Sequence, residues 1–154
     1  EKELTFLVVL DDSEEIFNAL RYAAKRSART NGRVALLYTF ETLEFSHWKA
    51  VEDIAEIELR EEAESKIKEY ENYVNNFSNK KPKKFIMKGD RIECIINFLN
   101  ANKFISNFIL ASSPSKSGGD PLINAFTIKQ STKIKVPITI IPPTLTEEEI
   151  DNLS

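Results

Sequence analysis

The chain has 154 residues, of which 42% are hydrophobic and 29% charged, and its formal net charge is -3 at pH 7. This is the size and composition of one domain with a substantial core. The acidic balance argues against a general nucleic-acid-binding surface, which would carry a basic stripe. No apolar segment approaches about 18 residues, and no basic stretch followed by an apolar core opens the chain. We therefore expect neither a membrane span nor a signal peptide.

The cysteine and histidine content limits the chemistry that is available. A single cysteine, Cys94, cannot form an internal disulfide, and a single histidine, His47, leaves no imidazole cluster for a metal. We therefore expect a cytoplasmic protein of a reducing compartment, without a metal site.

The first strand and helix are the clearest predicted elements. Residues 6–10 form an uninterrupted apolar run, which is typical of a parallel strand covered on both faces. From Ile16 to Ala24, apolar residues recur every three or four positions, which predicts a helix. Asn31-Gly32 supplies the left-handed residue that ends this helix.

Two aspartates and a serine, Asp11, Asp12 and Ser13, fill the junction between that strand and that helix. In an open parallel sheet, ligands bind outside the carboxyl ends of the strands, where the strand order reverses. These residues are therefore the first candidates for ligand binding. The alternative is that the aspartates only end the strand and that Asp12 or Ser13 caps the helix.

The rest of the chain alternates between strand-like and helix-like segments. Residues 41–50 are irregular, Asp90 caps the third helix, and 113–121 form a long loop of the kind that holds ligands. We predict strands at 33–40, 84–88, 106–112 and 136–142, and helices at 51–77, after Asp90 with Ile92, Ile95, Ile96 and Leu99 buried, and at 122–133. The sequence thus predicts one α/β domain with a parallel sheet.

Three further residues have two interpretations each. Cys94 lies off the apolar face of its helix, so we expect it to be partly exposed. It either has a redox role or, since no neighbouring base lowers its pKa, has none. His47 and Trp48 follow the second strand and either fold over the crevice as a lid, or pack (Trp48) and face solvent (His47).

The last predicted strand has proline at both ends, which confines it to a sheet edge. An apolar edge strand is a hazard unless it is covered or paired, and pairing with a second copy across a two-fold axis is one remedy. Val136, Ile138 and Ile140 are the candidate dimer residues.

Three motifs, in this order, resemble the universal stress protein family: Asp11-Asp12-Ser13 after the first strand, Gly89-Asp90 after the third, and Val136-Pro137 at the start of the last. The resemblance extends from Leu4 to Pro142. It implies a three-layer, open parallel five-stranded sheet of order 3-2-1-4-5, which is Rossmann-like and adenine nucleotide alpha hydrolase-like. It also implies stress adaptation and a homodimer through the fifth strand. We expect a single domain of this family at 1–143, followed by a polar, peripheral tail at 144–154 in which residues 146–150 can form one helical turn.

The phosphate-binding loop of nucleotide-binding relatives is altered in this sequence. Their Gly-x2-Gly-x9-Gly-Ser/Thr pattern falls on Ala111, Pro114, Asn124 and Ala125. Pro114 has no N–H to donate and Ala125 has no hydroxyl, so two phosphate contacts are lost. We therefore predict no cofactor. The alternative is that Lys116 with Gly118-Gly119 rebuilds a site that binds ATP or AMP and hydrolyses ATP slowly.

The candidate ligand-binding set is made up of residues around the predicted crevice: Asp11, Asp12, Ser13, Phe40, Ala111, Ser112, Ser113, Lys116, Gly118 and Gly119. We predict no catalysis and no catalytic residue. The predicted function is that of a homodimer that acts in stress adaptation through contacts with an unidentified protein partner or through a small ligand.

Three rival classes fit the sequence less well. A receiver domain also opens with paired acids, which hold Mg²⁺, but its phospho-acceptor would have to be Asp53, in a helical pattern, and Lys135 precedes the last strand instead of ending it. A flavodoxin-like carrier needs a hydroxyl-rich and glycine-rich phosphate loop where two acids stand. A hydrolase needs a Gly-x-Ser-x-Gly elbow, which is missing.

Overall fold

The computed structural model describes residues 2–42, 49–114 and 120–154. The strands are β1 (Thr5–Val9), β2 (Arg33–Phe40), β3 (Lys83–Lys88), β4 (Asn107–Ala111) and β5 (Ile138–Ile141). The helices are α1 (Ile16–Thr30), α2 (Lys49–Asn75), α3 (Arg91–Ala101), α4 (Pro121–Asn124) and α5 (Glu147–Leu153), together with a π-helical turn η1 (Ala125–Lys129) and a 3-10 turn η2 (Ser131–Lys133).

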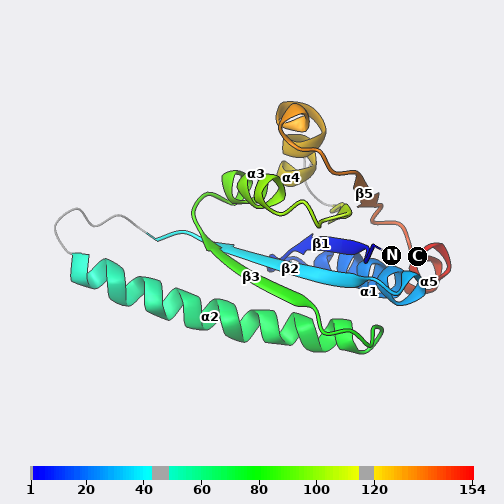
Figure 1. The fold of residues 1–154 in the computed structure, drawn as a ribbon, viewed down its shortest axis with the longest axis horizontal. Coiled ribbons are helices and arrows are strands. Elements are labelled where there is room, and N and C mark those ends of the chain that lie inside the picture. Colours follow the sequence, from blue (N-terminus) through cyan, green and yellow to red (C-terminus); the bar gives the residue numbers. More distant parts are fainter. Residues whose placement is uncertain (1, 43–48, 115–119) are drawn as a thin grey trace.

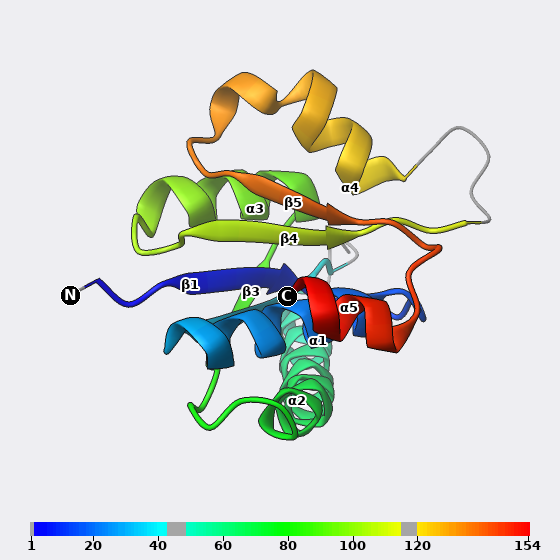
Figure 2. The same ribbon diagram turned by 90° about the vertical axis from the view of Figure 1, so that its right-hand side faces the viewer.

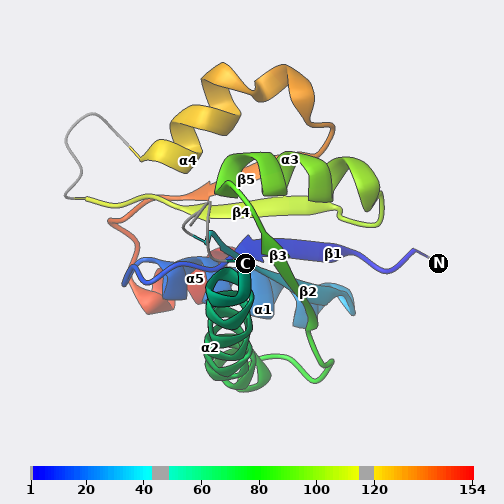
Figure 3. The ribbon, with the colours of Figure 1, turned by 90° about the vertical axis from the view of Figure 1, so that its left-hand side faces the viewer.

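The five strands form one sheet in the order β3-β2-β1-β4-β5, and every neighbouring pair is parallel. The predicted order and fold class are therefore confirmed. Helices α1, α2 and α5 cover one face of the sheet, and α3, α4 and η1 cover the other (Figure 2, Figure 3). Three layers result, as the family resemblance implied.

The apolar run in β1 supplies both cores. Phe6, Val8 and Leu10 point into the cluster beneath α1, α2 and α5, whereas Leu7 and Val9 point into the cluster beneath α3 and η1. All five side chains are at most 4% exposed. Successive strand residues alternate between the faces, so the run from Phe6 to Leu10 in a strand covered on both faces is apolar at every position.

Helix α1 ends at Asn31, which takes the left-handed conformation with φ 54° and donates its N–H to the carbonyl of Ser27. The next residue, Gly32, is required for a different reason. A Cβ atom there would lie 2.4 Å from the carbonyl oxygen of Leu4, so a side chain would collide with the backbone that enters β1.

Cys94 is buried in α3 at 4% exposure, which corrects the expectation that it is partly exposed. Its Sγ lies under the Gly89 turn, 3.1 Å from where a Cβ of that glycine would stand. Burial raises the pKa of the Cys94 thiol. The helix itself begins as predicted, with the Asp90 carboxylate accepting from the Glu93 N–H at 3.1 Å.

We expected residues 144–154 to be a peripheral tail, but they contain α5, which packs against α1. Thr146 and Glu149 form a reciprocal capping box at its start. Ile150 is 1% exposed within the α1 cluster. On the facing helix, Arg21 donates to both carboxylate oxygens of Asp151, at 2.7 and 2.8 Å.

The segment 122–133, which was predicted as one helix, belongs to three short elements, α4, η1 and η2. The Gln130 N–H donates to the carbonyl of Ala125 at 2.6 Å, which closes the π turn. Thr127 and Ile128 are β-branched and Ser131 and Thr132 follow closely. These residue types have low helix propensity, so the interruption has a local cause.

Candidate functional site

The candidate site is a small pocket at the carboxyl ends of β1 and β4, which are neighbours in the sheet (Figure 2). The chain moves outward from β1 through β2 to β3, then crosses back to β4 and β5, so the strand order reverses between β1 and β4. This is the switch point at which open α/β sheets bind ligands. The lining residues are Val9, Asp11, Ser13, Glu15, Ile16, Ile109, Leu110, Ala111, Asp120 and Leu122.

Asp11 is fixed in place by three hydrogen bonds. Its Oδ1 accepts from the Ser13 backbone N–H at 2.9 Å and also from the Ser13 hydroxyl. Its carbonyl oxygen accepts from the Tyr70 hydroxyl of α2 at 2.8 Å. Burial, followed by the nearby Asp12 carboxylate, raises the pKa of Tyr70. This phenol therefore stays protonated and remains a donor at neutral pH.

The start of α1 differs from the prediction that Asp12 or Ser13 caps it. The N-cap position is Glu15, and no side chain caps the helix. The first turn is closed by the backbone instead, with N–H groups of Phe17 and Asn18 donating to carbonyls at positions 14 and 15. The carboxylate of Asp11 accepts from Ser13 in an Asx turn. It therefore stabilises the turn that follows β1 and does not cap α1.

Asp12 does not line the pocket. Its side chain is 78% exposed and its Oδ1 lies 3.0 Å from Nζ of Lys66 on α2, which also contacts Glu62 at 3.5 Å. The hydrogen bond that the Lys66 ammonium donates to the Asp12 carboxylate raises the pKa of Lys66 above its ordinary value. Lys66 is therefore a cation that is already paired outside the pocket.

The opposite wall of the pocket comes from β4 and the start of α4. Ala111 ends β4, and Asp120 caps α4 by accepting from the N–H groups of Leu122 and Ile123, at 3.0 and 3.4 Å. Pro121 follows at the first helical position. An acid before a proline is a recognisable helix start. Asp120-Pro121 is therefore a local signal for this wall, and Asp120 is a lining residue that the candidate set lacked.

The electrostatics of the pocket are one-sided. Three of its lining residues, Asp11, Glu15 and Asp120, carry carboxylates, and among the described residues none that lines it is a lysine, arginine or histidine. The cavity volume is about 20 Å³, which is room for roughly one water molecule. No group of His, Cys, Asp and Glu side chains in the described ranges is arranged to hold a metal ion. The described walls therefore suit a neutral or cationic group better than a phosphate.

The remaining predicted site residues lie in three places. Phe40 is buried at the end of β2, where Arg60 lies 5.3 Å over its ring and its carbonyl accepts from the Gly89 N–H. The Ser112 N–H donates to the Ile141 carbonyl at 2.9 Å. Ser113 is half-buried and Pro114 is exposed. Lys116, Gly118 and Gly119, like His47 and Trp48, lie outside the described residues.

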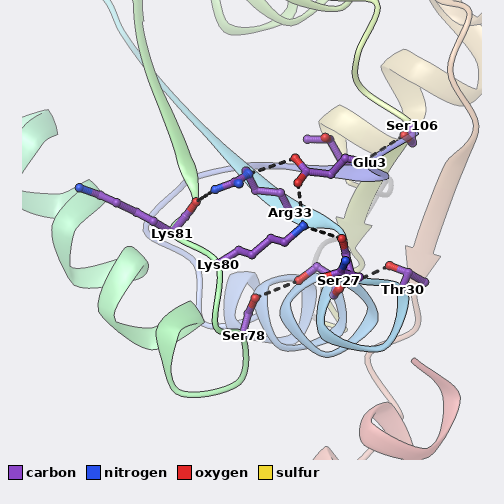
Figure 4. A network of polar contacts seen from close by, with 10 residues as sticks. Glu3, Ser27, Thr30, Arg33, Ser78, Lys80, Lys81 and Ser106 are labelled. Carbon is purple, nitrogen blue, oxygen red and sulfur yellow. Dashed lines mark hydrogen bonds and ion pairs between the residues drawn. The ribbon is translucent and has the colours of Figure 1, made fainter. Parts of the chain in front are cut away.

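The opposite end of the sheet carries a polar network in which cations are paired (Figure 4). Glu3 accepts from Arg33 at 3.1 Å and from Lys80 at 2.8 Å. Lys80 also donates to the Asn31 carbonyl, and Arg33 donates to the Lys81 carbonyl. The turn at Lys80 and Lys81 before β3 is therefore tied by hydrogen bonds to Glu3, Asn31 and Arg33.

The edge strand β5 lies beside β4 alone in the described sheet. Ile140 is 40% exposed, and Val136 and Ile138 are half-buried. The predicted edge position is thus confirmed. Pairing with a second copy stays a prediction.

An open parallel sheet with a pocket at its switch point defines a Rossmann-like α/β protein. Within that class, the model of the universal stress protein family matches residues 4–104. The match covers more than half of the chain, and the chain therefore belongs to the universal stress protein family, as the sequence motifs suggested.

Solved structures agree with this fold. The universal stress protein UspA from Lactobacillus plantarum is 15% identical with a TM-score of 0.73, covering 92% of this chain and 99% of that one. A family protein from Burkholderia pseudomallei is 16% identical with a TM-score of 0.65, covering 90% and 95%. A universal stress protein in complex with cAMP is 11% identical with a TM-score of 0.61, covering 92% and 98%.

A search of curated proteins finds no significant match to this sequence. Within the described ranges, no helix has the length and hydropathy to cross a membrane.

Proposed function

We propose that this chain is a non-catalytic, cytoplasmic universal stress protein that acts as a homodimer in stress adaptation, through protein contacts or a small ligand without phosphate groups. The observation that carries the proposal is the acidic lining of the pocket by Asp11, Glu15 and Asp120. The altered phosphate loop at Ala111 and Pro114 supports it from the sequence side.

The charge argument is simple. A nucleotide phosphate placed beside these carboxylates meets like charges, and like charges repel more strongly in a partly buried site than in water. Lys66 of α2 lies near the end of β1, but its ammonium group is paired with Asp12. The backbone N–H of Ser112 is also committed, to β5. The described residues of the pocket would therefore repel a phosphate group and offer it few hydrogen-bond donors.

The competing function is adenine-nucleotide binding through a remodelled loop that contains Lys116, Gly118 and Gly119. One observation favours it: a structural relative was solved in complex with cAMP. At 11% identity that likeness concerns the fold alone, so we keep this function as the second candidate.

Calorimetric titration with ATP, ADP, AMP and cAMP, with and without Mg²⁺, separates the two functions. We expect no binding at about 1 mM nucleotide; a dissociation constant of that size would correspond to a binding free energy of roughly -4.1 kcal/mol. A dissociation constant at or below about 100 μM, roughly -5.5 kcal/mol, would overturn the proposal. If Lys116→Ala and Gly118→Ala then weakened that binding, while Lys129→Ala did not, the remodelled loop would be the site.

The dimer is tested by sedimentation velocity. We expect a dimer at micromolar concentration and a monomer for Ile140→Lys, because a charged side chain at the edge opposes strand pairing. Ile128→Lys is the matched control, since Ile128 is 71% exposed on η1 and off the edge. A wild-type monomer would contradict the predicted dimer.

A further inference from the structure

The amino-terminal turns of α2 project beyond the end of the sheet, and no labelled element lies beside them in Figure 1. Three large apolar side chains are exposed there: Val51 at 46%, Ile54 at 58% and Ile57 at 58%. They are half of the six exposed large apolar residues in the described ranges. Single exposed apolar residues are ordinary, but a contiguous group with a polar rim marks an interaction surface.

These residues lie on the side of α2 that faces away from the sheet. On the sheet side of the same turns, Glu56 contacts Lys88 of β3 at 3.3 Å and Arg60 covers the ring of Phe40. Positions three apart are neighbours on a helix surface, so Val51, Ile54 and Ile57 form one continuous strip. We call this strip the α2 apolar face.

The surroundings of the α2 apolar face are acidic. Asp53, Glu58 and Glu61 are exposed in the same turns. Residues 49–62 hold six acidic and two basic side chains. A second copy of this chain on the face would bring these carboxylates together, and like charges across an interface are costly. The charge pattern therefore favours a cationic partner.

We propose that the α2 apolar face binds a basic amphipathic helix of a partner protein, with the apolar side of that helix on Val51, Ile54 and Ile57 and its lysines or arginines beside Asp53, Glu58 and Glu61. An exposed helical strip of this kind is matched by helical anchors at intervals of three and four residues. The inference rests on the proposed function, because it gives a chemical class to the protein partner.

The test is fluorescence anisotropy of the full chain with a labelled peptide of about 18 residues, built from leucine and lysine in an amphipathic helical pattern. The matched peptide has glutamate in place of lysine. We expect saturable binding of the lysine peptide that weakens at high salt, and no binding of the glutamate peptide.

Two variants locate the binding. Ile54→Ser with Ile57→Ser keeps the charge of the chain and is expected to weaken binding by at least about tenfold, because two apolar anchors are lost. Ile128→Ser removes an exposed isoleucine on η1 and is expected to change nothing. Asp53→Asn, Glu58→Gln and Glu61→Gln together are expected to weaken binding and flatten its salt dependence.

Three results would overturn the inference. Equal peptide binding by the Ile54→Ser, Ile57→Ser variant would place the peptide elsewhere. Loss of a wild-type dimer in that variant would make the face a contact between copies. A fall in its melting temperature would mean that the chain itself covers the face. Nucleotide binding in the crevice would overturn the proposed function but leave this titration unchanged, so the two failures are distinguishable.

Discussion

The packing of α5 against α1 is tested most directly by the substitution Ile150→Ala. Ile150 is 1% exposed and belongs to the apolar cluster that α1 forms with the sheet. Truncating a buried isoleucine removes the transfer free energy of its methyl groups and leaves a cavity. We expect the free energy of unfolding to fall by about 3 kcal/mol. For a chain of this length, that loss lowers the melting temperature by about 9 °C.

Leu153→Ala is the matched control for this experiment, since Leu153 lies on the same helix but is 64% exposed. Its substitution is expected to change the free energy of unfolding by less than about 0.5 kcal/mol. Guanidinium unfolding followed by circular dichroism measures both variants, and an unchanged slope keeps the comparison valid. If Ile150→Ala cost no more than Leu153→Ala, α5 would not be packed on α1 and our description of it would be wrong.

Two further predictions concern titratable groups. The Arg21 guanidinium holds the pKa of Asp151 below its ordinary value of 3.8. The unfolded chain therefore takes up this proton at higher pH than the folded chain, so the stabilisation is complete above about pH 5 and is lost as the pH falls through the folded pKa. The excess stability of the wild type over Asp151→Asn should shrink between about pH 5 and pH 2, as measured by urea unfolding; a constant difference would contradict this. Because burial raises the pKa of Cys94, a disulfide reagent should modify it slowly in the native protein and rapidly in guanidinium, and rapid native modification would contradict the buried position.

The positions of the strands and their parallel type were predictable because buried parallel strands leave a strong local signal. A strand that is covered on both faces is rich in apolar residues, and residues 6–10 and most of 33–40 have that character. The proline pair around the last strand placed it at an edge for a stereochemical reason. The motifs then fixed the strand order, which the pattern alone left open.

The walls of the pocket were only partly predictable. Asp11, Ser13 and Ala111, three of the candidate residues, line the pocket, because strand ends and the residues after them are local features. The Tyr70 hydroxyl donates to the carbonyl of Asp11 from a position 59 residues further along the chain. No local pattern distinguishes that tyrosine from others in the apolar stripe of α2. The cap of α1 was mispredicted because Asp11 forms an Asx turn with Ser13, and an acid in that segment fits a cap equally well.

The sequence indicated one helical turn at 146–150 and not the whole of α5, because the helix depends on tertiary contacts. The segment 146–153 is short and acidic, and an isolated helix of that length is marginal in water. The capping box and the contacts of Ile150 and Asp151 with α1 stabilise it. Composition alone therefore suggested a polar tail.

The two roles considered for Asp11, ligand binding and ending the strand, are compatible in this structure. Its carboxylate lines the pocket while Oδ1 accepts from Ser13, and its carbonyl is held by Tyr70. A ligand that recruited this carboxylate would have to share or displace the bond from Ser13. A neutral or cationic donor can share a carboxylate, which has about four lone-pair sites, whereas a phosphate oxygen offers no donor and adds repulsion. The hydrogen bonding of this residue thus favours the same class of ligand as the acidic lining of the pocket.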